Sequence, residues 1–113
     1  MIAANRSFVE QHPIAAKRAL RNILKAMGFC AAWPERSAQF LVKRGSTPRY
    51  DYDLQMVKDI PYGYHRDLDP EDTARFYALW LREVGMIRST PESVLAHGTD
   101  WRCLNELLQE LEA

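Results

Sequence analysis

Six prolines punctuate this sequence, and their positions constrain the fold more than any other feature. Proline has no backbone N–H and clashes with the preceding turn, so it suits the first position of a helix and breaks its interior. Four prolines open stretches with apolar residues at helical spacing: Pro13, Pro34, Pro70 and Pro91. Pro61 ends another such stretch, and Pro48 falls in a turn. The sequence predicts an all-α fold, a compact bundle of about six helices in which residues 1–113 form a single helical domain.

Polar residues at the helix ends support this division. Side-chain oxygens of Ser, Thr and Asp accept hydrogen bonds from the first free N–H groups of a helix, and glycine tolerates the left-handed conformation that often follows the last turn. We expect N-caps at Ser7, in a capping box with Glu10, and at Asp69, Thr90 and Thr99. We expect helix stops at Gly45 and Gly85. A helix over residues 50–60 is predicted from the spacing of Tyr50, Leu54 and Val57.

Apolar stripes indicate which helix faces are available for packing. The helix after Pro13 has one stripe, opposite a polar face with Lys17, Arg18, Arg21, Asn22 and Lys25; we expect solvent on that face rather than a polyanion. The helix after Pro70 has a stripe of large side chains, and the last helix has leucines that we expect to point inward. The three stripes are Ala16, Leu20, Ile23, Leu24, Met27, Cys30 and Ala31; Phe76, Leu79, Trp80 and Val84; and Leu104, Leu107, Leu108 and Leu111.

The charges divide the chain in two, although fifteen basic and fifteen acidic residues cancel. Residues 1–50 contain nine Lys or Arg against two acids, and residues 51–113 contain six against thirteen. A basic half could bind nucleic acid, or the two halves could attract each other in the folded chain. We favour the second interpretation because no net positive charge is present to gather phosphates. Residues 72–97 form a helix, turn and helix, but their acids argue against DNA. No nucleic-acid partner is expected.

No arrangement of residues predicts catalysis, so we do not expect an enzyme. His12, His65 and His97 lie far apart and beside helix ends or turns, and no G-x-S-x-G or glycine-rich phosphate loop is present. Cys30 and Cys103 fall on apolar helix faces, where buried free thiols are favoured over a single disulfide. Helix capping accounts for the acids over residues 67–72 better than a cation site does. We expect no catalytic residue, no metal site and no cofactor.

Membrane insertion is not expected either. No apolar run approaches the roughly 20 residues that a membrane span needs, and the first residues, MIAANR, do not have the pattern of a signal peptide. We therefore expect a cytoplasmic protein if the chain is expressed as written.

Several short segments, taken together and in order, resemble the carboxy-terminal third of one family. They are FVEQHP (8–13), AKRAL (16–20), ILKA (23–26), residues 30–41 with Pro34, Glu35 and Ala38, RYDY (49–52), IPYG (60–63), DPED (69–72), RFYA (75–78), GMI (85–87) and GTDW (98–101). The family is the NMT1/THI5-like solute-binding proteins, the nitrate, sulfonate and taurine branch that serves ABC importers. Each segment alone is a weak motif, and the resemblance rests on their joint order over nearly the whole chain.

The resemblance implies a helical segment of a periplasmic protein in which two α/β lobes close over a small solute. It implies that this chain does not bind solute by itself, and that residues 1–6 are the stump of a strand or disordered. The expected partners are the missing amino-terminal lobes or a second copy in a homodimer, with an ABC permease by resemblance only. Candidates for the interface are Tyr50, Tyr52, Tyr62, Tyr64 and Trp80, although most of them could instead be buried in the chain's own core. The chain could also be a fragment of the related thiamine-pyrimidine synthase enzymes, or a stand-alone helical interaction scaffold.

Overall fold

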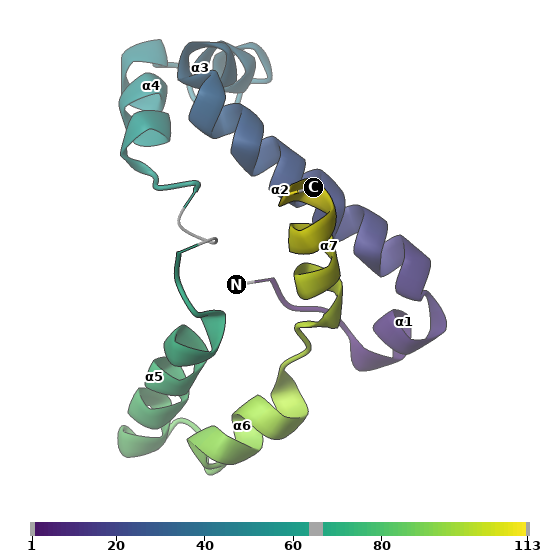
Figure 1. The fold of residues 1–113 in the computed structure, drawn as a ribbon. Helices are drawn as coiled ribbons and strands as arrows, with labels where there is room; N and C mark the ends of the chain where they lie inside the picture. Colours follow the sequence, from purple (N-terminus) through teal and green to yellow (C-terminus); the bar gives the residue numbers. More distant parts are fainter. Residues whose placement is uncertain (1, 64–66, 113) are drawn as a thin grey trace. The chain divides into compact units, whose positions relative to one another are not determined.

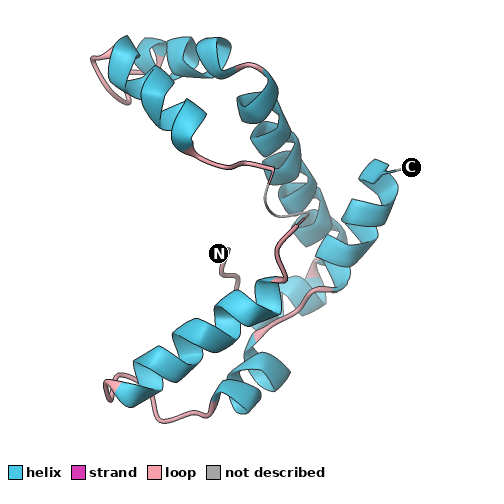
Figure 2. Cartoon of the chain, turned by 60° about the vertical axis from the view of Figure 1, so that its left-hand side comes forward, coloured by secondary structure: helices cyan, strands magenta, loops and turns pink. Residues whose placement is uncertain are grey.

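The computed structural model describes residues 2–63 and 67–112, and this part of the chain contains seven helices and no strand (Figures 1 and 2). The helices are α1 (Arg6–Gln11), α2 (Pro13–Ala32), α3 (Pro34–Lys43), α4 (Tyr50–Asp59), α5 (Pro70–Glu83), α6 (Pro91–Gly98) and α7 (Arg102–Glu112). The prediction of an all-α fold is confirmed. Residues 2–5 have no regular secondary structure.

Proline opens four of these helices, as the sequence predicted. Pro13, Pro34, Pro70 and Pro91 each occupy the first helical position. The Asp69 side chain accepts a hydrogen bond from the N–H of Glu71, and the Thr90 hydroxyl accepts one from the N–H of Ser93. These bonds satisfy N–H groups that have no partner within the helix.

Two predicted N-caps were wrong. Asn5, not Ser7, caps α1: its side chain accepts from the N–H of Ser7 at 3.1 Å, so the helix begins at Arg6. Asn is as good a cap as Ser, and it comes first along the chain. Thr99 does not cap α7, because its hydroxyl donates backward to the carbonyl of Leu95 at 2.6 Å. Asp100 instead accepts from the N–H of Arg102 at 3.1 Å.

The predicted glycine stops are confirmed. Gly45 and Gly85 have φ values of 76° and 81°, a conformation that costs other residues steric strain. The N–H of Gly45 donates to the carbonyl of Val42, and the N–H of Gly85 donates to the carbonyl of Arg82. Each glycine therefore ends its helix and turns the chain into the following loop.

The residues group into two compact units, and each is described by itself. The first unit, Met1–Tyr64 with Cys103–Ala113, contains α1 to α4 and nearly all of α7. Within it, α3 packs closely on α4, and α2 contacts α1, α3 and α4. Its buried apolar side chains are Leu24, Ala38, Val57 and Leu107. The second unit, His65–Arg102, is the pair α5 and α6, in which Ala74, Ala78 and Pro91 are buried. The single domain that we predicted from the sequence stays a prediction.

Candidate functional site

The most distinctive surface of the second unit lies on α5. Phe76, Leu79, Trp80 and Val84, which we call the α5 outer face, are between 47% and 62% exposed. Tyr77 extends this surface, with its ring edge-on to the ring of Phe76 at a centroid distance of 5.6 Å. Four large apolar side chains along one helix face are costly to leave in water, and contiguous surfaces of this kind usually mark an interface.

The opposite side of α5 is the one that packs within its own unit. Ala74 and Ala78 are buried, and α5 and α6 are in close contact. At about 100° per residue, each of these alanines lies about 160° around the helix axis from Phe76. Helix α5 therefore has two apolar faces on opposite sides. The small-residue face packs in the α5–α6 pair, and that pair leaves the face of large side chains uncovered.

Polar side chains fix the first turn of α5. Asp69 caps the helix, and Arg75 forms ion pairs with Asp72 at 2.9 Å and with Glu71 at 4.0 Å. Acids in the first turn also interact favourably with the positive end of the helix dipole. The acids near residue 70 thus have structural roles, as the capping interpretation predicted.

The five predicted interface residues lie in different environments. Trp80 is on the α5 outer face of the second unit, whereas Tyr50 and Tyr52 are exposed in the first turn of α4 in the first unit. The Arg49 guanidinium lies 3.7 Å from the centre of the Tyr52 ring. Tyr64 lies outside the described residues.

Tyr62 is partly buried in the first unit rather than exposed. Burial raises the pKa of its phenol above the ordinary value, and the Cys30 thiol adds to the shift through electrostatics and a hydrogen bond. Cys30 and Cys103 are both free thiols and half-buried. Tyr62 therefore fits packing within the chain's own core, while Trp80 fits the interface hypothesis.

An ionic cluster joins the basic face of α2 to α7 within the first unit. Lys17 Nζ lies 2.9 Å from Glu106 and 2.7 Å from Glu110, and Arg21 lies 2.6 Å from Glu110. Hydrogen bonds from Lys17 and then Arg21 hold the pKa of Glu110 below its usual value, and Glu110 and then Glu106 raise the pKa of Lys17. These contacts are the attraction between basic and acidic halves that the charge distribution predicted.

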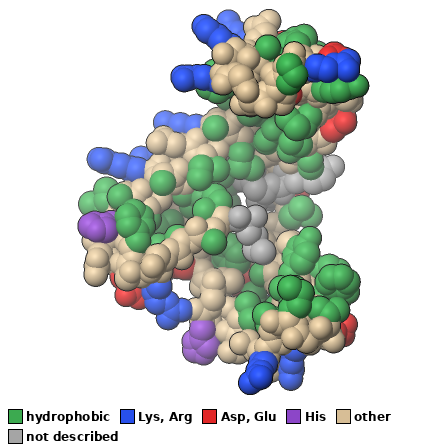
Figure 3. All heavy atoms as spheres, turned by 180° about the vertical axis from the view of Figure 1, so that it is seen from behind, with side chains coloured by type: hydrophobic (Ala, Val, Ile, Leu, Met, Phe, Trp, Pro, Cys, Tyr) green, Lys and Arg blue, Asp and Glu red, His purple; other side chains and the backbone are tan. Residues whose placement is uncertain are grey.

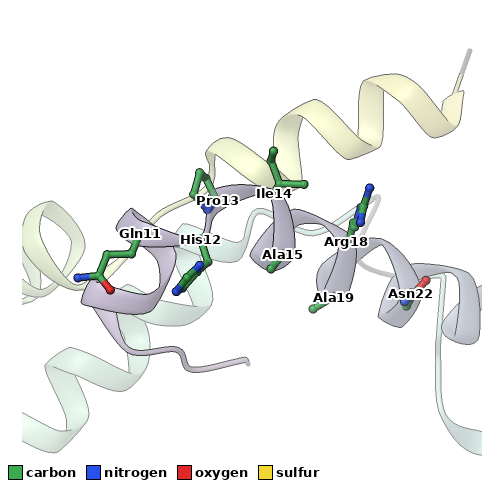
Figure 4. A pocket seen from close by; sticks show the side chains of 8 residues that line it. All are labelled: Gln11, His12, Pro13, Ile14, Ala15, Arg18, Ala19 and Asn22. Carbon is green, nitrogen blue, oxygen red and sulfur yellow. The ribbon is translucent and has the colours of Figure 1, made fainter.

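A shallow depression of about 610 Å³ lies where α1 meets α2 (Figure 4). It is lined by Gln11, His12, Pro13, Ile14, Ala15, Arg18, Ala19 and Asn22. Its lining side chains do not converge, since Pro13 and Ile14 lie on one side of the ribbon and His12 and Ala15 on the other. This geometry does not enclose a small solute.

The histidines and the acidic residues of the described part of the chain do not form a metal site. No group of three or more His, Cys, Asp or Glu side chains in residues 2–63 and 67–112 is placed to hold a metal ion. His12 packs on the Phe8 ring at 5.3 Å, and His97 lies in the last turn of α6. His65 lies outside the described residues. Among the helices that are described, none is long and apolar enough to cross a membrane.

No protein-family model, curated protein or solved structure matches the chain.

Proposed function

We propose that this chain is the carboxy-terminal helical segment of an ABC-importer solute-binding protein of the nitrate, sulfonate and taurine type. In this proposal it is not an enzyme and does not bind solute alone. It covers the α/β lobes of the periplasmic protein, which supply the sheets and most of the cleft. The ABC permease is a partner of the assembled protein rather than of this segment.

The observation that carries the proposal is the pair of opposite apolar faces on α5. Helices with one apolar stripe lie at a surface, whereas helices that are apolar on two sides are typical of positions between two packed layers. Ala74 and Ala78 pack within one layer, the α5–α6 pair, while Phe76 and Trp80 are exposed and can pack on a second layer. Helices packed on a sheet of an α/β lobe bury a face of this kind.

The resemblance in the sequence supports a sheet of an α/β lobe as the second layer. The segments DPED and RFYA, which resemble the family's sequence, are the start and the middle of α5. Of the four residues of the outer face, Phe76 lies within these segments. The open depression at α1 and α2 also agrees with a chain that contributes cover rather than a solute cavity.

Complementation in trans tests the proposal. A taurine- or sulfonate-binding protein of this class would be truncated before its late helices and mixed with the chain. We expect a stable complex and recovery of solute binding, measured by calorimetry. Calorimetry of the chain alone against nitrate, sulfonates, taurine and pyrimidines should give no heat, and saturable binding there would contradict the claim that it is incomplete.

Paired variants show whether the α5 outer face makes this contact. Phe76→Asp with Trp80→Asp should abolish the complex, because burying two carboxylates in an apolar interface is strongly unfavourable. The matched control is Ser89→Asp with Ala96→Asp, which adds the same two negative charges to the same unit at exposed positions. Equal loss with both pairs would argue against a role for the outer face.

A second candidate is a stand-alone interaction scaffold that pairs with its own copy. The exposed α5 outer face favours it, because the same apolar surface on a second copy could cover it. Sedimentation separates the two candidates, since a dimer that Trp80→Asp converts to a monomer supports the scaffold.

A further inference from the structure

The outward side of α3 combines aromatic rings with positive charges. Trp33, Arg36, Phe40, Lys43 and Arg44, which we call the α3 aromatic–basic face, are all exposed. With about 100° between successive residues, Arg36, Phe40 and Lys43 fall within an arc of about 60° around the helix, and Trp33 and Arg44 are the residues at its two caps. The space-filling view shows Lys and Arg side chains beside hydrophobic ones at the end of the first unit that carries α3 and α4 (Figure 3).

The rings and the guanidinium groups lie against one another on this face. The Arg36 guanidinium lies 5.2 Å from the centre of the Trp33 ring, and the Arg44 guanidinium lies 5.3 Å from that of Phe40. These cation–π contacts leave Trp33 53% and Phe40 56% exposed. The face therefore presents apolar and positive surface side by side to whatever it meets.

The charges of this face are not neutralised within the described part of the chain. Arg36, Lys43 and Arg44 form no ion pair with a described carboxylate. Arg49, by contrast, pairs with Asp51 at 2.8 Å. The one acid of α3, Glu35, lies on a different side of the helix, about 100° from Arg36.

Helix α3 is held from its other side. Ser37 and Ala38 are buried, Leu41 and Val42 are half-buried, and α3 packs closely on α4. The Ser37 hydroxyl donates to the carbonyl of Trp33 at 2.9 Å. The aromatic–basic face is therefore presented by a fixed helix and does not need to unfold from the unit to meet a partner.

We infer that the α3 aromatic–basic face docks the chain on an anionic phospholipid surface. Trp rings are enriched at the headgroup level of membranes, and clustered Lys and Arg side chains are attracted to anionic lipid headgroups. Three of the five side chains come from one side of α3, and the other two come from the residues at its caps. The formal net charge of the chain is zero, so general attraction to anions does not arise and this local face must supply it.

This inference uses residues of the first unit only and does not depend on the proposed function of the α5 outer face. It describes peripheral docking by a ten-residue helix that is too short to cross a bilayer. The two surfaces lie on different helices, so variants of one can be tested without altering the other.

Co-sedimentation with lipid vesicles tests the inference. Vesicles that contain phosphatidylglycerol should bind the chain, vesicles of phosphatidylcholine alone should not, and salt at about 1 M, where the Debye length is about 3 Å, should release it. The variant with Arg36, Lys43 and Arg44 all changed to Gln should bind about a hundredfold more weakly, since each cation near an anionic surface contributes about fivefold. The matched control changes Arg75, Arg82 and Arg88 to Gln, which removes the same charge from the second unit.

A second pair of variants distinguishes lipid from a soluble polyanion. Trp33→Ala with Phe40→Ala should weaken binding to the anionic vesicles and leave binding to heparin unchanged, because only a bilayer offers an interface for the rings. Phe76→Ala with Trp80→Ala is the control with the same loss of aromatic area, and circular dichroism establishes that all variants are helical. No binding to anionic vesicles at low salt, equal loss with both charge variants, or binding to heparin but not to lipid would overturn the inference.

Discussion

Helices α7 and α5 are both amphipathic, and the structure uses their apolar residues in opposite ways. In α7 three of the four leucines predicted to point inward do so: Leu107 is fully buried, and Leu104 and Leu108 are half-buried. The prediction was wrong for Leu111, near the end of the helix, which is exposed. The acids Glu106 and Glu110 pair with α2. In α5 the small side chains Ala74 and Ala78 are buried, while Phe76, Leu79 and Trp80 are exposed. Most of the apolar face of α7 therefore packs within its own unit, whereas α5 has an apolar face that its own unit leaves exposed.

The difference shows what a helical stripe does and does not predict. Periodicity shows that a helix has an apolar face, and the largest side chains are usually assigned to the core. When a second face of small residues allows a closer approach between helices, as the alanines of α5 do toward α6, the large residues are left for another contact. A stripe of large side chains is therefore evidence for burial, but the covering partner can lie outside the unit.

The largest expected change in the free energy of unfolding distinguishes the packing of α7 from that of α5. Leu107→Ala removes a fully buried side chain and should lower the free energy of unfolding by about 2–5 kcal/mol. Trp80→Ala, which removes more atoms, should change it by no more than about 0.5 kcal/mol because the ring is exposed. Urea unfolding of the isolated chain followed by circular dichroism measures both. A larger loss for Trp80→Ala than for Leu107→Ala would reverse the comparison.

A larger side chain on the alanine face of α5 tests which of its two faces is packed. Ala78→Leu forces extra volume into the α5–α6 contact and should cost about 1–3 kcal/mol. Leu79→Ala, the neighbouring position on the outer face, should be nearly neutral for the isolated chain. Hydrogen exchange of the α5 and α6 amides would report the change in this pair of helices. Equal effects at the two positions would mean that α5 packs differently from this account.

The two units also differ in buried polar groups, since the buried polar side chains found in the described residues, Ser37 and Asp53, belong to the first. Asp53 is 2% exposed and accepts a hydrogen bond from the Thr47 hydroxyl at 2.6 Å. Thr47→Val keeps the side-chain shape but removes this donor, and should cost about 1–3 kcal/mol. The same variant combined with Asp53→Leu should recover part of the loss, measured by the urea midpoint. No loss in Thr47→Val would show that the carboxylate has another donor.

The smallest effect should come from the ionic cluster between α2 and α7. Because the pKa of Glu110 is lowered on folding, its contribution to stability is present above its ordinary pKa of 4.5 and is lost as the pH falls through the lowered value. Glu110→Gln should therefore reduce stability slightly at neutral pH and have no effect well below pH 4.5, with the difference fading as salt is added. Glu83→Gln, in the other unit, is the charge-matched control. A Glu110→Gln effect that persists in acid would contradict the pairing.

Local signals predicted most of the fold. Proline at the first helical position, the Asp69 and Thr90 caps and the two left-handed glycines act within a few residues, so the sequence alone locates them. The two wrong caps also have local reasons: Asn5 precedes Ser7 and takes the capping role, and Thr99 bonds backward to Leu95. Which of two neighbouring polar side chains caps a helix depends on where the helix begins. Sequence patterns locate that position only to within about one or two residues.

The surfaces were harder to predict because they depend on contacts between helices. The sequence singled out Trp80, but not the opposite alanine face that explains why the ring is free. It grouped Tyr62 with exposed tyrosines, although Tyr62 packs toward Cys30 of α2. The spacing of the aromatic and basic residues from Trp33 to Arg44 is visible in the sequence. It did not predict an exposed face, because Trp and Phe are also found in protein cores.

The most direct test of the central claim is the exposure of Trp80, measured by fluorine NMR of the chain labelled with fluorotryptophan. The shift of the Trp80 signal between H2O and D2O reports contact with solvent. We predict a large solvent shift for Trp80 in the monomeric chain, and its loss when truncated lobes of a sulfonate-binding protein are added. A Trp80 signal without solvent shift in the monomer would mean that the chain buries its own α5 outer face, and would contradict the account.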